Sequence, residues 1–505
     1  MDDHQDQHDQ RNIRLDKLAR LKELGVNPYP YRFQPTHRAA ALLEQGDGLV
    51  ESGEKVSAAG RLMSLRDMGK AAFAHIKDNH ERIQIYVRKD AVGEGAFEVF
   101  GLCDLGDYIG LSGTMMRTKT GELTLRVEQL ELLAKAIRPL PVPKVEVRDG
   151  EQVVHHEVRD VEFRYRQRYA DLALNDDVAR VFLGRSQILG CVRDYLAGQG
   201  YLEVETPILQ GIYGGAAASP FTTHHKALNI PLYLRIATEL YLKRLVVGGF
   251  DRVFEIGKDF RNEGIDRLHN PEFTMVEFYE AYADYHVMMD HFEAIYEKCA
   301  LEVHGGTTFT FQGTALDVKR PWRRVTMTDA LRELGKVDFP ALSDEEVRSL
   351  LKTHHIEPGG GYNRGLAMAA LFETLCEEKL IQPTFILDFP KETTPLCKQH
   401  REHPELVERF EPYMAGWELG NAYSELNDPQ VQKALLQEQA ARRQSGDEEA
   451  HPYDADFIRA MEYGMPPMGG IGLGIDRMVM LLLDQPSIRD VLLFPTMRPE
   501  AGMEE

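Results

Sequence analysis

Apolar and polar residues alternate along the segment from Lys55 to Ala136, and glycine-containing turns separate the alternating runs. Alternation with a period of two predicts β-strands, because successive strand side chains point to opposite faces. About five short strands within roughly 80 residues are typical of a small barrel. We therefore predict an OB-fold barrel in the N-terminal part of the chain.

The alternation also sorts the side chains of two of these strands. Apolar residues occupy the even positions from Ala72 to Ile76 and the odd positions from Ile83 to Val87. The opposite faces carry aromatic, amide and basic side chains, namely Phe73, His75, Lys77, Gln84, Tyr86 and Arg88. Such a mixed face suits stacking on unpaired bases and hydrogen bonding to their edges, so it favours a nucleic-acid surface.

Leucine recurs at positions 15, 18, 21 and 24, and Gly25 ends the pattern. This spacing predicts an amphipathic helix with arginine and lysine on its other faces. The basic face is compatible with nucleic-acid contact and equally with a docking helix that exposes its charges to solvent. The preceding residues, MDDHQDQHDQ, are predicted to be a polar tail, and their acidity argues against a signal peptide.

Three segments follow from the change of pattern along the chain. The stretch RPLPVPKVEVRDGEQ is rich in proline and then polar, which predicts a linker over 141–163. Longer helix and strand patterns run from there to the end, so we expect a helix-plus-barrel domain at 1–140 and a second domain at 164–505. Within the second domain, the pattern predicts a helical insertion near 330–380.

The composition describes a globular chain with more than one core. With 505 residues, 43% hydrophobic and 28% charged, about two or three domains are expected. No apolar run approaches the roughly 18 residues that cross a bilayer. The five cysteines lie far apart, which favours reduced thiols in a cytoplasm and argues against disulfides or a zinc site. The net charge is −21, yet residues 11–138 are slightly basic, which permits local contact with a polyanion.

A short charged loop, FRNEG, lies between two segments that both read as strands, DRVFEIGKDF and HNPEFTMVEFYEAYADY. In the second strand Phe273, Met275, Glu277 and Tyr279 share one face by the two-residue period. Arg261 lies at the edge of that face, where a guanidinium can bind phosphate. A hairpin with a surface salt bridge is the structural alternative.

Two further stretches carry a pattern. GGIGLGIDRMVMLLL places Gly470, Gly472 and Gly474 on one strand face and then opens a helix, whose N-terminus favours phosphate. A buried strand packed tightly on a helix is the alternative. FLGRSQILGCVRDYLAGQGYLEVETPIL predicts a helix ended by Gly198 or Gly200 and a strand closed by Pro207.

These three segments resemble motifs 2, 3 and 1 of the class II aminoacyl-tRNA synthetases. Together with the barrel they resemble the subgroup for lysine, aspartate and asparagine, over nearly the whole chain. The matching stretches are YLKRLVVGGF, FRNEG, HNPEFTM, YSELND and GIDRMVM. The resemblance implies an α+β fold: an OB-fold barrel, then an antiparallel sheet flanked by helices that dimerises through the motif 1 helix. It also implies that ATP and an amino acid form an adenylate, from which the aminoacyl group passes to the terminal adenosine of tRNA.

The resemblance implies a set of ATP-binding residues: Arg261, Glu263, His269, Phe273, Gly474 and Arg477. Arg261 would hold the α-phosphate, Phe273 would stack on the adenine, and Arg477 would bind the γ-phosphate. Glu263 and His269 would help to place the nucleotide. Arg261 and Arg477 are then the catalytic residues, because the substrate carboxylate is itself the nucleophile and only positioning and charge stabilisation are needed.

Two glutamates, Glu411 and Glu418, match the residues that bind Mg²⁺ in the family. There the Mg²⁺ ions, about three at most, bridge the phosphates of ATP. A hairpin centred near Met414 and Ala415 would pair the two glutamates on one face. Strict alternation, however, places Glu418 opposite the face of the next strand residues, so a bulge at Gly420 is needed. Solvated surface acids are the alternative.

The expected amino-acid pocket contains Gly215, Glu239, Glu277, Tyr279, Asn421, Tyr423 and Glu425. Carboxylates and phenols suit an ammonium group on a long apolar stem and would repel aspartate, so lysine is the predicted substrate. Glu425 and Glu277 would hold the ε-ammonium and Glu239 the α-ammonium. The aspartate and asparagine relatives typically carry glutamine at position 239.

For the tRNA(Lys) anticodon, the resemblance points to Phe73 for stacking and Gln84 for a base edge. The third contact is assigned to Gln129, where bacterial members often carry a carboxylate. Three alternatives remain: a paralogue that modifies elongation factor P, an aspartyl- or asparaginyl-tRNA synthetase, and an inactive tRNA-binding regulator. The N-terminal domain opposes the first, the acidic pocket the second, and the intact catalytic and metal-binding residues the third.

Overall fold

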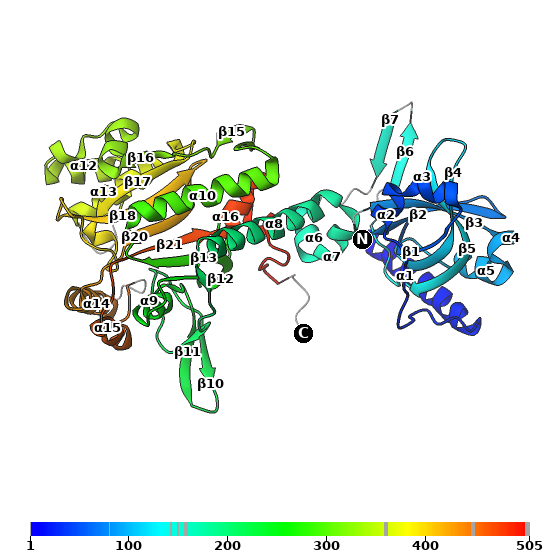
Figure 1. Ribbon diagram of the computed structural model, residues 1–505, viewed down its shortest axis with the longest axis horizontal. Helices are drawn as coiled ribbons and strands as arrows, with labels where there is room; N and C mark the ends of the chain where they lie inside the picture. The colour runs from blue at the N-terminus through cyan, green and yellow to red at the C-terminus, as the bar shows by residue number, and fades with distance from the viewer. Residues whose placement is uncertain are drawn as a thin grey trace. The chain divides into compact units, whose positions relative to one another are not determined.

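The computed structural model describes residues 2–79, 81–141, 144–148, 151–155, 160–357, 362–445 and 450–499. The chain forms two compact units, residues 1–179 and 180–505, which are called unit 1 and unit 2 (Figure 1). Among the described residues, no helix is both long enough and apolar enough to cross a membrane.

Unit 1 contains the barrel that the alternation predicts. Its five strands close in the order β1-β2-β3-β5-β4. They are β1 (Lys55–Asp67), β2 (Ala71–Asp78), β3 (Glu81–Arg88), β4 (Tyr108–Arg117) and β5 (Leu123–Ala134). The apolar positions of 72–76 and 83–87 are buried in the core, as predicted. Lys77 departs from the pattern, since it is buried and its Nζ donates to the carbonyl of Ala173 at 3.1 Å.

The helices of unit 1 correct one prediction and favour one of two alternatives for another. They are α1 (Asp2–Glu23), α2 (Ala39–Glu44), α3 (Gly46–Ser52), α4 (Lys89–Val92), α5 (Glu94–Gly101), α6 (Val161–Arg166) and α7 (Arg168–Leu174). The predicted polar tail is helical, because α1 begins at Asp2. The basic face of α1 docks in part: Arg14 is buried and donates to three backbone carbonyls, and Lys17 pairs with Asp104 at 2.6 Å.

A hairpin lies within the segment predicted as a linker. Its strands are β6 (Lys144–Arg148) and β7 (Glu151–His155). The sequence signal for it is the alternation KVEVR and EQVVH around Asp-Gly, a pair that favours two-residue hairpin turns. The boundary between the two units falls inside α8 (Asp176–Gly198), which ends at one of the two glycines predicted.

Unit 2 is built on one large sheet with the order β16-β17-β18-β20-β21-β13-β12-β8, and β19 pairs with β18. The strands are β8 (Leu202–Glu203), β12 (Arg252–Phe260), β13 (Glu272–Ala281), β16 (Arg323–Thr326), β17 (Thr384–Pro390), β18 (Leu406–Met414), β19 (Trp417–Glu418), β20 (Gly420–Ser424) and β21 (Met468–Gly474). The predicted antiparallel pairing holds except at the two ends, where β16–β17 and β12–β8 are parallel.

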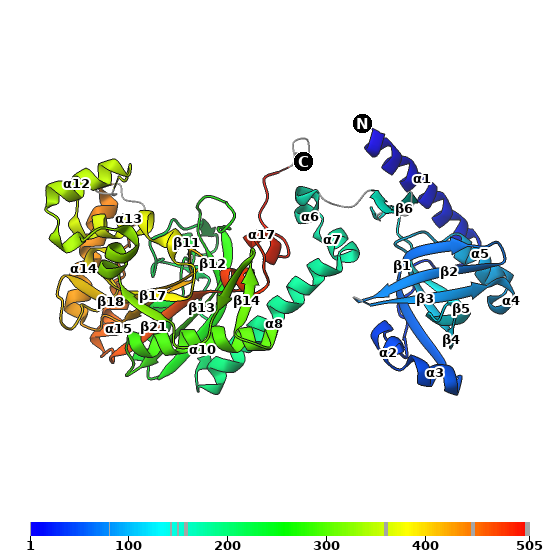
Figure 2. The same ribbon diagram turned by 90° about the horizontal axis from the view of Figure 1, so that it is seen from above.

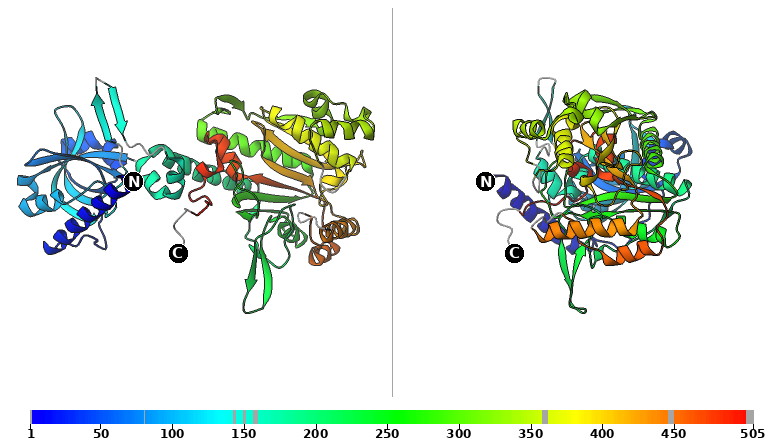
Figure 3. Two further views of the ribbon diagram at one scale, coloured as in Figure 1. Left: turned by 180° about the vertical axis from the view of Figure 1, so that it is seen from behind. Right: turned by 90° about the vertical axis from the view of Figure 1, so that its left-hand side faces the viewer.

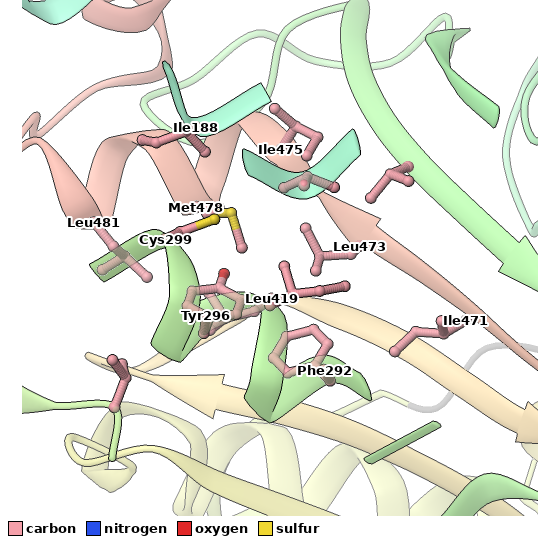
Figure 4. Close-up of a cluster of buried hydrophobic side chains, with 14 of the residues drawn as sticks. Ile188, Phe292, Tyr296, Cys299, Leu419, Ile471, Leu473, Ile475, Met478 and Leu481 are labelled. Atoms are coloured by element: carbon pink, nitrogen blue, oxygen red, sulfur yellow. The ribbon is translucent and has the colours of Figure 1, made fainter. Parts of the chain in front are cut away.

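One hydrophobic cluster of unit 2 lies against one face of this sheet. Figure 4 shows Ile471 and Leu473 of β21 directed toward Phe292 and Tyr296 of α10 (Tyr285–His304). Met478 of α16 (Ile475–Leu482) packs into the same cluster. The glycines that alternate with Ile471 and Leu473 therefore lie on the opposite face of the sheet, away from this cluster.

The remaining elements surround the sheet. The small sheet of β9 (Leu209–Gln210), β10 (Thr222–His225) and β11 (Ile230–Leu234) includes a hairpin that projects from unit 2 (Figure 3). The predicted insertion contains α11 (Met327–Ala330), α12 (Asp344–Thr353) and α13 (Arg364–Leu375), and α12 and α13 lie near β17 and β18 (Figure 2). The other elements are α9 (Glu239–Val247), β14 (Thr308–Phe311), β15 (Thr314–Asp317), α14 (Pro429–Gln444), α15 (Ala455–Glu462) and α17 (Ile488–Val491).

Candidate active site

A cavity of about 390 Å³ lies on the glycine face of the sheet. It is lined by 14 of the residues predicted for the site in unit 2, which are Gly215, Glu239, Arg261, Glu263, His269, Phe273, Glu277, Tyr279, Glu418, Asn421, Tyr423, Glu425, Gly474 and Arg477. Glu411 is the one predicted residue of unit 2 that is not part of the lining. The structure thus brings together around one cavity the residues that the resemblance assigned to ATP and to the amino acid.

The register of three strands explains why the side chains converge. Gly470 of β21 lies between Tyr279 of β13 and Tyr423 of β20, and Gly472 lies between Glu277 and Asn421. A Cβ atom built on Gly470 would lie 2.2 Å from Oε1 of Glu425 and 2.3 Å from a ring carbon of Tyr279. Glycine at this position thus leaves the space into which neighbouring acidic and phenolic side chains fold.

Glu277 occupies the floor of the cavity and is 5% exposed. One of its oxygens accepts from the backbone N–H of Thr238 at 3.3 Å, and the other accepts from the hydroxyl of Tyr279 at 3.1 Å. Burial, with the nearby carboxylates of Asp259 and Glu239, raises the pKa of Glu277 to about 8. The carboxyl is therefore poised to ionise when a cation enters.

Lys243 pairs with two of the predicted pocket acids. Its Nζ lies 2.5 Å from Oε1 of Glu239 and 2.5 Å from Oε2 of Glu425, and its side chain is fully buried. Burial lowers the pKa of Lys243, but the two carboxylates outweigh that effect and hold the pKa above its usual value. Burial, partly offset by Lys243, raises the pKa of Glu425 to about 8.

Cationic side chains lie at the other end of the cavity, around the FRNEG loop. The guanidinium of Arg261 lies 5.1 Å from the centre of the Phe273 ring, and its buried Nε has no hydrogen-bond partner among the described residues. Arg477 NH1 donates to the carbonyl of Glu418 at 2.5 Å, and its NH2 lies 3.2 Å from Nε2 of His269. This arrangement leaves donors available to an anion.

The β18–β19 hairpin corrects one prediction about the acid pair. Glu418 lies opposite Tyr413, so it is not paired with Glu411, because the turn is formed by Ala415 and Gly416 with φ of +55° and +75°. Glu411 and Tyr413 are two residues apart on one strand, however, so Glu411 and Glu418 still share a face. Pairing resumes at Phe410 with Ala422, which places one extra residue between Glu418 and Ala422. The extra residue falls in the stretch that contains Gly420, where a bulge was predicted.

The two glutamates influence each other. Burial and the carboxylate of Glu411 raise the pKa of Glu418 to about 7. Glu411 itself accepts from the hydroxyl of Tyr413 at 2.6 Å and from Arg409. In the parts of the chain that the structure describes, no group of three or more His, Cys, Asp or Glu side chains is arranged to hold a metal. A cation bound at this pair would thus need further oxygen ligands from another molecule.

The barrel of unit 1 brings together two of its three predicted residues. The rings of Phe73 and Tyr86 are stacked with centres 4.5 Å apart, and Gln84 lies on the neighbouring strand to Phe73. Gln84 Nε2 donates to Glu122 at 2.7 Å, and Thr124 donates to Gln84 at 2.7 Å. Glu122 is therefore a carboxylate beside the predicted base-binding residues, although the sequence patterns did not indicate it.

Gln129 lies elsewhere on the barrel. It is opposite Ser112 on β4, five residues along β5 from Thr124, which is the residue opposite Gln84. The structure thus does not place Gln129 beside Phe73 and Gln84.

The side chains in or behind the cavity wall that were not predicted include Arg409, His451 and Lys243. Arg409 donates from Nε to Oδ1 of Asn421 at 3.1 Å and also contacts Glu411. His451 lines the cavity, and burial together with the charges of Lys243 and Arg442 lowers its pKa to about 4. Lys243 had a detectable signal, since it stands four residues after Glu239 in a helical pattern. Arg409 and His451 reach the site only through tertiary packing.

Comparisons with known proteins agree with this geometry. The model for tRNA synthetases class II (D, K and N) matches residues 160–498, and a model for an OB-fold nucleic acid binding domain matches residues 56–133. The lysine–tRNA ligase of Moorella thermoacetica is 49% identical over 495 residues, covering 98% of this chain and 99% of its own. The lysine–tRNA ligase of Enterococcus faecalis is 49% identical over 500 residues, covering 98% of each.

Replacing Gly470 with alanine is expected to disable the acidic end of the cavity. The new Cβ would displace the side chains of Glu425 and Tyr279. A misplacement of about 1 Å in an active site can lower the reaction rate on the order of 100-fold, so we expect lysine binding to weaken strongly as well. Calorimetric titration with lysine measures the effect. The matched control is Gly474→Ala, whose Cβ would come no closer than 3.6 Å to another residue and should leave lysine affinity near that of the unaltered protein. Equal affinities for the two variants would contradict this account.

Proposed function

Because the chain belongs to the class II tRNA synthetases of the D, K and N group, we propose that it is a lysine–tRNA ligase. It activates L-lysine with ATP to form lysyl-adenylate and transfers the lysyl group to the 3′ end of tRNA(Lys). The observation that carries the proposal is the cavity in which buried carboxylates lie on one side of a glycine strip and the cationic side chains around the FRNEG loop lie on the other. Relatives that are 49% identical over nearly the full length support it.

The acidic end of the cavity supports selection of lysine. Glu277 and Glu425 are proposed to bind the ε-ammonium, with the phenol of Tyr279 beside them, and Glu239 the α-ammonium. Asn421 and Tyr423 form the wall. Gly215 has a φ of +92°, and a Cβ atom built there would lie 3.0 Å from the Cβ of Glu239, so glycine keeps this space free. An aspartate side chain would bring a further negative charge to these carboxylates, which is strongly unfavourable in a buried site.

At the other end, Arg261 is proposed to bind the α-phosphate of ATP and Arg477 the γ-phosphate, with the adenine stacked on Phe273. Glu263 and His269 complete the nucleotide contacts, and Gly474 leaves room for the nucleotide. The lysine carboxylate oxygen forms a bond to the α-phosphorus while the bond from that phosphorus to the bridging oxygen breaks, and pyrophosphate leaves. Arg261 stabilises the charge that develops on the phosphorus oxygens, so no side chain need act as a nucleophile.

Mg²⁺ is proposed to be held by Glu411 and Glu418. The fit rests on chemistry visible at the pair: two carboxylates share a face, and the pKa of Glu418 is raised by burial and by Glu411, so a divalent cation would relieve their repulsion. When bound, Mg²⁺ supplies positive charge to the phosphates. Arg409 keeps Glu411 oriented through a side-chain contact.

The barrel is proposed to bind the anticodon. Phe73 would stack on one base and Gln84 would bind the edge of another. Glu122 is proposed for the third contact in place of Gln129, because it lies within hydrogen-bond distance of Gln84. A nucleic-acid-binding role is supported by the match of residues 56–133 to an OB-fold nucleic acid binding family.

A homodimer is proposed through the motif 1 region. Five large apolar side chains are 43–52% exposed there, on α8, β8 and the segment 208–212: Leu183, Leu202, Ile208, Leu209 and Ile212. Exposed apolar clusters of this kind are typical of protein interfaces. A cytoplasmic location is proposed because all five cysteines are free and buried.

ATP–pyrophosphate exchange with a panel of amino acids tests the function. Exchange that depends on lysine supports the proposal. Exchange with aspartate or asparagine would identify a different member of the group, and exchange with a lysine derivative in place of lysine would favour the paralogue that modifies elongation factor P. No exchange with any amino acid would favour the inactive regulator.

Arg261→Ala is expected to abolish most lysine-dependent exchange, by about 100-fold to 1,000-fold, because a donor to the developing phosphate charge is lost. The exchange rate measures lysine activation, and the sedimentation of the variant shows whether the dimer is still folded. Arg267→Ala, an exposed arginine of the same loop outside the cavity lining, is the control and should stay near the unaltered rate. Near-normal exchange by Arg261→Ala would remove Arg261 from the proposed mechanism.

Phe73→Ala is expected to weaken aminoacylation of tRNA while sparing lysine-dependent exchange. Loss of one stacked base costs about 1–3 kcal/mol, so kcat/KM for tRNA should fall about 5-fold to 150-fold. Glu122→Gln should act in the same direction and Gln129→Ala should not. A similar loss in both reactions would contradict the division of labour between the two units.

Leu183→Glu is expected to shift the protein from dimer to monomer, since a charge would be buried at the proposed interface. Analytical ultracentrifugation measures the mass. Leu43→Glu, which alters a 40%-exposed leucine of unit 1, is the control and should leave the dimer intact. A dimer of unchanged stability with Leu183→Glu would place the interface elsewhere.

A further inference from the structure

Resting on the proposed function, we propose that Lys243 is a positioning residue that sets the spacing of the two carboxylates, Glu239 and Glu425, that take the substrate's two ammonium groups. Lys243 would act as a resident ammonium ion behind the pocket wall. It would thereby contribute to the selection of lysine over shorter diamino acids, although it does not itself contact the substrate.

The position of Lys243 supports an indirect role. Its side chain is fully buried, and it is absent from the residues that line the cavity, whereas Glu239 and Glu425 line it. The ammonium group of Lys243 lies 2.5 Å from one oxygen of Glu239 and 2.5 Å from one oxygen of Glu425, so these two oxygens lie within about 5 Å of each other. Two carboxylates of like charge would otherwise separate or take up a proton.

The ammonium group of Lys243 also contributes to the charge balance of the cavity. Three buried carboxylates, Glu239, Glu277 and Glu425, face the cavity, and each is at most 5% exposed. A lysine substrate brings two ammonium groups, so it leaves one carboxylate without a cation unless the chain supplies one. Neither oxygen of Glu425 has a hydrogen-bond partner among the described residues, so its ion pair with Lys243 is its main compensation.

Two carboxylates held at a fixed distance can also discriminate between substrates by the length of the side chain. When one carboxylate binds the α-ammonium and another the ε-ammonium, the number of methylene groups between them decides whether both contacts form together. Ornithine is one methylene group shorter than lysine and would lose one contact or strain both. A pocket discriminates a single methylene group by roughly 10-fold to 200-fold, and the discrimination should fall when the carboxylates are free to move.

Several titratable groups surround this pair and determine how it responds to pH. Lys243 faces Glu239 on its own helix, Glu425 after β20, Cys397, His451 and the ring of Tyr279, which is 6.0 Å away. Glu277, in turn, faces Asp259 and Glu239. Removing the ammonium leaves mainly acidic groups around Glu425 and should raise its pKa further. Lysine binding would then require a higher pH, because the substrate ammonium needs the ionised carboxylate.

The test uses the full-length protein and lysine-dependent ATP–pyrophosphate exchange at several pH values between about 6 and 9. Lys243→Met removes the charge and keeps a stem of similar length. It is expected to raise the KM for lysine about 10-fold near neutral pH with a smaller change in kcat, and to move the acid limb of kcat/KM to higher pH by about one unit. The ratio of kcat/KM for lysine to that for ornithine should fall about 10-fold.

Lys243→Arg tests the spacing without removing the charge, and it remains informative if Lys243→Met does not fold. Its pH profile should stay near that of the unaltered protein, while the lysine-to-ornithine ratio falls, because the wider guanidinium separates the two carboxylates. In a Lys243→Met, His451→Gln double variant the shifted acid limb should persist, since it is assigned to Glu425.

Three results would overturn the proposal. These are an unchanged KM and pH profile with Lys243→Met, an unchanged lysine-to-ornithine ratio with Lys243→Arg, and loss of the shifted limb in the double variant. Failure of the proposed function is distinguishable, because the unaltered protein would then show no lysine-dependent exchange at all.

Discussion

Buried carboxylates need cations, and this requirement governs the cavity of unit 2. Glu239, Glu277 and Glu425 are buried side chains that line one cavity, and the charge of Glu239 adds to the effect of burial in raising the pKa values, and thus the cost of ionisation, of Glu277 and Glu425. Lys243 offsets part of that cost in the unliganded protein. On the proposed assignment, the two ammonium groups of lysine would offset the remainder, and this charge complementarity would select a ligand with two ammonium groups.

The sheet makes this arrangement possible through its register. β21 places Ile471 and Leu473 against α10 and α16 on one face and carries Gly470, Gly472 and Gly474 on the other, so one strand serves both the core and the cavity. The extra residue between Glu418 and Ala422 then returns β20 to the register that carries Asn421 and Tyr423 into the pocket. The packing of the core and the opening of the ligand site thus both follow from the alternation of side chains along these strands, which is interrupted by the extra residue before Ala422.

Local patterns were informative where the contacts are local. The period of two correctly indicated which residues of β13 face the cavity, and it identified the barrel and the buried faces of β2 and β3. The polar tail, which was predicted from composition, was wrong, since α1 begins at Asp2. The β6–β7 hairpin was missed, although its strands alternate around an Asp-Gly pair. The pairing within the β18–β19 hairpin was also wrong, because the position of a turn depends on which residues adopt positive φ.

By itself, the sequence specified the faces of the strands, the glycine strip and the set of residues available to a synthetase of this group, because periodicity and short motifs are properties of neighbouring residues. Only the tertiary structure decided which of these residues meet. Lys243 reaches Glu425, and Gln84 reaches Glu122, across long separations in the chain. Such contacts depend on strand order, on register and on how helices pack against the sheet, and no local pattern encodes those distances.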